Sequence, residues 1–88
     1  MPEVSRFYGI IARMQSERGG KHHKPHIHAL YSEYEIVIAF DGEVLEGCFP
    51  MKQRKILEAW IMIHEDELIE NWNLLNSGEG FFKIEPLK

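Results

Sequence analysis

Apolar and polar residues alternate along the first half of the chain and follow a helical period along the second half. Residues 6–14 are aromatic and β-branched and predict a first strand, and the segments 26–31, 34–40 and 44–49 predict three more. Asp41-Gly42 is a strong hairpin signal, and Ser32-Glu33 is the other expected tight turn. The pattern therefore predicts a β-meander over residues 6–49, interrupted by a polar loop at residues 15–25.

The period lengthens after Pro50, a residue that suits the first turn of a helix. Ile56, Trp60 and Ile63 recur at helical spacing, and a second apolar series runs over residues 68–75 behind the acidic segment 65–67. Residues 50–78 are therefore expected to be helical, as one bent helix or two, with an extended tail at 79–88. The whole predicts one α+β domain over residues 1–88: a three- or four-stranded antiparallel sheet, then two C-terminal helices packed on one face.

Composition narrows the class of protein. The chain has 88 residues, of which 44% are hydrophobic, and this is ordinary for a small globular domain. Cys48 is the only cysteine, which excludes an internal disulfide and a zinc site built on cysteines. Neither a secretory signal nor an apolar run of membrane-spanning length is visible, so a cytoplasmic protein without a membrane partner is expected.

Charge is distributed unevenly. The net charge is −4, yet residues 1–28 carry five basic and two acidic residues, giving +3, whereas residues 29–88 carry five basic and twelve acidic residues, giving −7. An anionic ligand would accordingly be held at the N-terminal end. The candidate phosphate-binding residues are Arg6, Arg13, Lys21 and Lys24.

Two-residue turns would fix the register of the meander. Ala29 would then face Ile36, and Ile38 would face Leu45, on the side that receives the helices. The opposite side would carry His26, His28, Glu35 and Glu46, with His28 and Glu46 in one row on either side of Val37. Two imidazoles and two carboxylates would thus share one surface of the sheet.

This group of side chains permits three interpretations. His26 and His28 could act as general acid and base, because histidine titrates near neutral pH. The same pair, with Glu35 or Glu46, could hold a divalent metal such as Zn, Ni or Mn. The third interpretation is a solvated polar face without chemistry.

Five short segments carry a resemblance to a known family. They are Met-Pro-x-x-Ser-Arg-Phe-x-Gly-Ile at 1–10, Pro-His-Ile-His at 25–28, Tyr-x-x-Tyr at 31–34, Glu-x-Glu-Leu-x-Glu-Asn-Trp at 65–72 and Lys-Ile-Glu-Pro-Leu at 83–87. Together they resemble a family of small bacterial proteins catalogued as a domain of unknown function. The resemblance implies a two-gene operon similar to toxin–antitoxin modules, and hence a small protein partner from the same operon.

The first functional hypothesis is a toxin-like module component that acts on RNA or binds it. His26 or His28 would be the catalytic base, and the basic residues named above would hold phosphate. Two alternatives stay open: a protein-interaction module that binds the operon partner or forms a homo-oligomer, and a small metal-binding protein.

Overall fold

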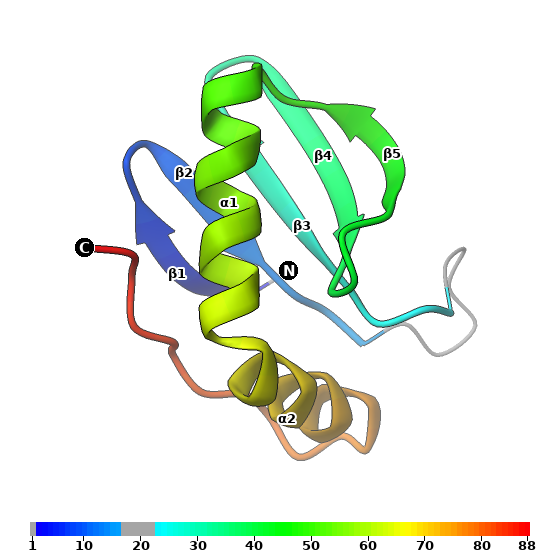
Figure 1. The fold of residues 1–88 in the computed structure, drawn as a ribbon. Helices are drawn as coiled ribbons and strands as arrows, with labels where there is room; N and C mark the ends of the chain where they lie inside the picture. Colours follow the sequence, from blue (N-terminus) through cyan, green and yellow to red (C-terminus); the bar gives the residue numbers. More distant parts are fainter. Residues whose placement is uncertain (1, 17–22) are drawn as a thin grey trace.

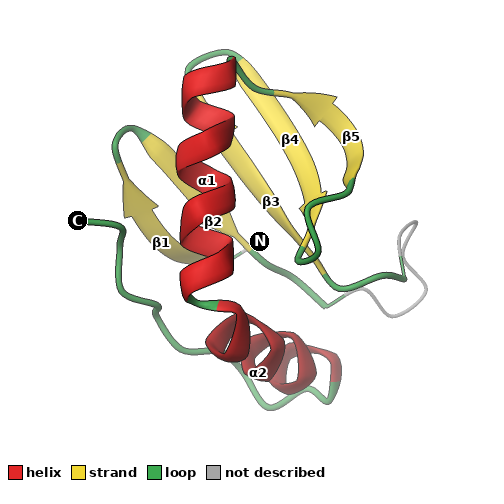
Figure 2. Cartoon of the chain, in the orientation of Figure 1, coloured by secondary structure: helices red, strands yellow, loops and turns green. Residues whose placement is uncertain are grey.

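The structure is a computed structural model that describes residues 2–16 and 23–88. Five antiparallel strands form one sheet in the order β1-β2-β3-β4-β5, and two helices follow (Figures 1 and 2). The class is therefore α+β, as predicted. The elements are β1 Glu3–Phe7, β2 Ile10–Arg13, β3 His26–Tyr31, β4 Tyr34–Ala39, β5 Val44–Cys48, α1 Met51–Ile63 and α2 Glu65–Asn76.

The sheet has five strands, whereas the sequence predicted three or four. The predicted first strand, residues 6–14, contains a hairpin: Tyr8 and Gly9 have φ angles of 48° and 79°, and Phe7 pairs with Ile10. Two consecutive positive φ values are the geometry of the tightest hairpin turn. Tyrosine rarely adopts it, and the sequence pattern alone therefore missed this turn.

The predicted register of the second hairpin is confirmed. Ala29 pairs with Ile36 and His28 with Val37, and the Ser32-Glu33 turn closes with a φ of 53° at Ser32. Strict alternation then sends Ile27, Ala29, Ile36 and Ile38 into the core.

For the hairpin of β4 and β5, the predicted register is right at one end and wrong at the other. Ile36 pairs with Gly47 as predicted, but Ile38 pairs with Val44 instead of Leu45. The turn is wider than two residues, since the Gly42 N–H donates to the Ala39 carbonyl, and the extra residue forms a β-bulge. Val44, not Leu45, consequently packs against the core.

The helical segment is broken at His64, which ends α1 and precedes α2 with φ −110° and ψ 24°. Helix α1 lies over one face of the sheet, as predicted, whereas α2 turns away and lies across the end of the sheet (Figure 1). Trp72 of α2 contacts Phe40 and His26 there, with ring centroids 6.3 and 5.0 Å apart. Helix α1 thus covers the face as predicted, and α2 packs against the same core from the end of the sheet.

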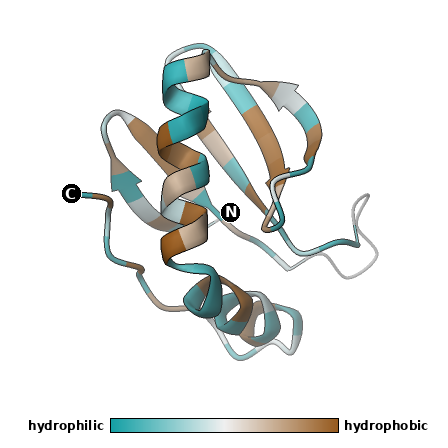
Figure 3. Cartoon of the chain, viewed as in Figure 1, coloured by the Kyte–Doolittle hydropathy of each residue, from teal (hydrophilic) through white to brown (hydrophobic). Residues whose placement is uncertain are grey.

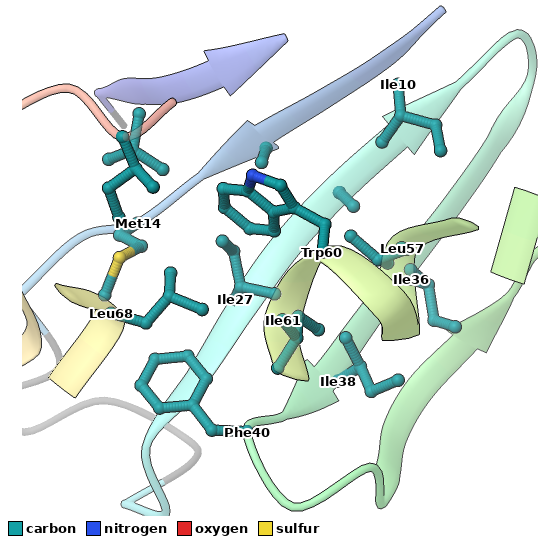
Figure 4. Close-up of a cluster of buried hydrophobic side chains, with 14 of the residues drawn as sticks. Ile10, Met14, Ile27, Ile36, Ile38, Phe40, Leu57, Trp60, Ile61 and Leu68 are labelled. Atoms are coloured by element: carbon teal, nitrogen blue, oxygen red, sulfur yellow. The ribbon is translucent and has the colours of Figure 1, made fainter. Parts of the chain in front are cut away.

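Trp60 is the largest fully buried side chain of the core. Its ring lies 4.9 Å from that of Phe7, and Figure 4 shows it in the middle of the buried cluster. The buried stripe of α1 is Leu57, Trp60 and Ile61, so the predicted inward position of Ile63 is wrong. Figure 3 shows hydrophilic and hydrophobic residues alternating along α1, as expected for a helix with one buried side.

The C-terminal tail, residues 79–88, contains no helix or strand and is held by individual hydrogen bonds. The Ile84 N–H donates to the Val4 carbonyl at 2.8 Å, which pairs the tail with the edge of β1. The Trp60 indole N–H donates to the Glu85 carbonyl, also at 2.8 Å. The tail therefore covers an edge that would otherwise expose free backbone groups.

Asn71 of α2 fixes the tail from the other side, and its replacement tests this attachment. Its buried amide donates to the Phe82 carbonyl at 2.8 Å and accepts from the Phe82 N–H at 2.9 Å. We expect Asn71→Ala to lower the free energy of unfolding by about 2–3 kcal/mol, because two backbone groups lose their partner. Urea denaturation measures the change, with the exposed Asn73→Ala as control. Equal stability of the two variants would contradict this role.

Gly47 allows strands β4 and β5 to approach each other. Its φ is 73°, and an added Cβ would lie 2.1 Å from the Glu35 carbonyl oxygen. We expect Gly47→Ala to destabilise the fold by more than about 3 kcal/mol, since a clash adds to the backbone strain. Gly42 also has a positive φ but has no atom within 4 Å of the added Cβ. Gly42→Ala should therefore cost only about 1–2 kcal/mol, and thermal unfolding of both variants measures the difference.

Candidate functional site

The sheet face away from α1 carries most of the side chains that the sequence singled out. Arg13 pairs with His28, His28 with Val37, and Val37 with Glu46, so the four residues form one row across β2 to β5. The predicted order of His28, Val37 and Glu46 is confirmed. A hollow of about 330 Å³ lies over this row, lined by His28, Glu35, Glu46 and residues 36, 37 and 47.

His26 lies apart from this surface hollow. Its side chain is buried, with 1% of its surface exposed, and its ring packs against Trp72 of α2 and against His28. The Nδ1 atom lies 2.6 Å from the Lys24 carbonyl oxygen, which can only accept a hydrogen bond, so Nδ1 carries the proton. The structure thus gives His26 a packing role, with little surface available to a substrate. Sequence alternation could not reveal this, because the cover comes from α2.

Arg6, a predicted phosphate-binding residue, is paired with a carboxylate. Its guanidinium donates to both oxygens of Glu3, at 2.8 and 3.2 Å. A β-bulge between Glu3 and Ser5 places residues 3 and 6 on the same side of the strand. The hydrogen bond lowers the pKa of Glu3 and raises the pKa of Arg6.

Lys24, another predicted phosphate-binding residue, is also paired. Its ammonium contacts Asp41 at 2.6 Å and Glu43 at 2.5 Å, both in or beside the β4–β5 turn. These hydrogen bonds raise the pKa of Lys24. The hydrogen bond between Lys24 and Asp41 also lowers the pKa of Asp41. Of the remaining predicted cations, Arg13 stands in the row beside His28, and Lys21 lies outside the described residues.

The predicted metal ligands His26, His28, Glu35 and Glu46 do not assemble into a ligand set. In residues 2–16 and 23–88, no three His, Cys, Asp or Glu side chains form a group that could hold a metal ion. Within the same ranges, no helix is long and apolar enough to cross a bilayer. Cys48 is a free, exposed thiol opposite Glu35.

The structure also contains a groove that the sequence did not predict. Two hollows, of about 440 and 190 Å³, lie between the β4–β5 turn and the corner where α1 meets α2. Phe40, Asp41 and Glu65 line both hollows, which are therefore neighbours; we call them together the corner groove. Its other lining residues are Lys24, Pro25, Gly42, Glu58, Ile61, Met62 and Ile69.

The corner groove combines exposed apolar side chains with an acidic rim. Met62 is 77% exposed and Ile69 is 41% exposed, and both line the groove. The lining carries the carboxylates of Asp41, Glu58 and Glu65 and one ammonium group, that of Lys24, which is paired with Asp41. One signal was available in the sequence. Residues 58–70 contain five acidic residues and no Lys or Arg, together with more apolar residues than one buried face of a helix would hold. Only the bend at residue 64 shows that they line one groove.

The comparison with known families matches most of the chain. Residues 9–73 match a family described as "Domain of unknown function (DUF4160)". No curated protein and no solved structure matches the chain. The prediction of a family of unknown function is confirmed, while the operon context, which these comparisons do not address, stays a prediction. Residues 1–8 and 74–88 lie outside the match.

The pairing of Lys24 with Asp41 makes a prediction about titration. The depressed pKa of Asp41 gives a contribution to stability that is present above the unfolded-state value of about 3.9 and is lost as the pH falls through the folded-state pKa. Lys24→Gln should raise the pKa of Asp41 toward its ordinary value, as carboxyl NMR titration would show. The pKa of Glu3, lowered by Arg6, serves as the internal control. An unchanged Asp41 titration would exclude the pairing in solution.

Proposed function

The chain belongs to the DUF4160 family, and from that premise we propose that it is a protein-interaction module that receives a partner protein in the corner groove. The observation that carries the proposal is the exposure of large apolar side chains around a hollow. Exposed apolar side chains that gather at one place on the surface often mark an interaction site.

The composition of the corner groove supports this function. Protein interfaces have an apolar centre, in which methionine and aromatic residues are enriched, and a polar rim. The groove has Phe40, Ile61 and Met62 on its walls and carboxylates at its margin.

The hypothesis of an RNA-directed activity has weaker support. Lys24 and Arg6 are each paired with carboxylates, and three glutamates share the sheet face with His28 and Arg13: Glu3, Glu35 and Glu46. Such carboxylates repel a nucleic acid backbone. The toxin-like assignment stays a prediction that rests on the resemblance and on the Arg13–His28 row.

Co-expression with the protein encoded by the adjacent gene tests the proposal. We expect the two proteins to co-purify in a fixed ratio, and Met62→Glu to weaken the complex at least tenfold, because a charge would enter the apolar wall. Met51→Glu is the matched control, since Met51 is also exposed and lies at the other end of α1, outside the groove lining. Isothermal titration calorimetry of the separated proteins measures the effect.

Two outcomes would contradict the proposal. One is a chain that stays free of the adjacent gene's product when both are soluble in the same cell. The other is cleavage of total bacterial RNA by the purified chain that His28→Ala abolishes and Met62→Glu leaves intact. That second result would establish the acid–base interpretation of the His28 row instead.

A further inference from the structure

We infer that the occupant of the corner groove is an amphipathic α-helix of the partner protein, with an apolar stripe flanked by lysine or arginine. It rests on the proposed function and specifies the chemistry of the partner. Three features of the groove lead to it: the state of its backbone groups, the sign of its charges, and the shape of its apolar wall.

No residue that lines the groove belongs to a strand. On one side, residues 24, 25 and 40–42 precede or follow strands, and the N–H groups of Phe40 and Gly42 already donate to the carbonyls of Pro25 and Ala39. The opposite side consists of the end of α1 and the first turns of α2.

An extended peptide would therefore find no open strand edge with which to pair in this groove. A bound segment must satisfy its own backbone groups, because leaving them unpaired in an interface costs free energy. The α-helix is the structure that does so within a single segment. Recognition of an amphipathic helix by an apolar groove is an established mode of peptide binding.

The charges at the rim call for a basic partner. Glu65 is exposed and lines both parts of the groove. Glu58 has a counter-ion, Arg54, at 3.4 Å, but both side chains are more than a third exposed, and such a surface pair contributes little. A lysine or arginine of the partner could replace Arg54 at small cost. Five acidic residues and no basic residue over positions 58–70 favour the approach of a cationic segment over an anionic one.

The two neighbouring hollows of the groove offer two places for apolar side chains of a bound helix. Met62 and Ile61 lie in the larger hollow, and Ile69 lies in the smaller one, with Phe40 shared between the two. Successive apolar residues of a helix, at spacings of three or four, could enter the two hollows in turn. Methionine adapts its shape to such an anchor, because its side chain is unbranched and flexible.

Peptides of defined chemistry test the inference directly on the full-length chain. The basic probe is a peptide of about 18 residues with leucines at helical spacing and lysines elsewhere, long enough to form a helix on binding. A second peptide has the same leucines but glutamates in place of the lysines. A third peptide is the basic probe with two central leucines replaced by prolines. It keeps the charge of the first peptide but cannot form a continuous helix. Amide NMR titration locates the binding surface on the protein.

The basic helical peptide should bind and shift the amides of residues 40–43 and 58–69. The acidic and the proline-containing peptides should bind at least tenfold more weakly. Met62→Glu should weaken the basic peptide at least tenfold, and Glu65→Lys should weaken it severalfold through charge alone. Met51→Glu should leave the affinity unchanged, because Met51 lies outside the groove lining.

Three results would overturn the inference. Equal binding of the proline-containing peptide would show attraction by charge without a helix. Shifts confined to the row of His28 and Glu46 would place the site on the sheet face. A dimer in light scattering that Met62→Glu dissociates would identify a second copy of the chain as the occupant.

The failure of this inference and that of the proposed function can be told apart. A partner that co-purifies but is insensitive to Met62→Glu and Glu65→Lys would leave an interaction module that uses another surface. The chain could also bind the basic helical peptide in the groove and yet capture no protein from its operon. That result would support the inferred chemistry of the groove and exclude the proposed partner.

Discussion

Trp60 connects the first hairpin, the helical segment and the C-terminal tail. The positions of these three segments follow from its burial. Its ring packs on Phe7 of the first hairpin, its indole N–H binds the backbone of the tail at Glu85, and its neighbour one turn later is His64, where the helical segment bends. A large aromatic side chain buries much apolar area, which matters in a small core. The burial of Trp60 in the core therefore fixes the position of α1 on the sheet.

The bend at His64 decides which surfaces are covered. Met62 and Ile63, at the end of α1, stay exposed, while α2 turns across the end of the sheet, where Leu68 enters the core and Trp72 covers His26. Two results follow from this turn: a histidine that looked chemically available is buried, and the corner groove opens between α2 and the β4–β5 turn.

What the sequence predicted correctly depends on local chemistry, and what it missed depends on contacts between distant segments. The pairing of β3 with β4 follows from alternation and a two-residue turn, so the row from His28 to Val37 was foreseeable. The bulge opposite Ile38 depends on how the 40–43 turn closes, and the cover over His26 depends on the direction of α2. No sequence pattern reveals that Lys24 forms ion pairs with two carboxylates that lie 17 and 19 positions later in the chain.

We propose the corner groove, and not the histidine-bearing face of the sheet, as the functional surface. An experimental structure of the chain bound to its co-purified partner is the direct test. We expect a partner helix between residues 40–42 and the corner of α1 and α2, with apolar side chains against Met62 and basic side chains near Glu65. A partner bound across His28 and Glu46, with the groove left empty, would contradict it.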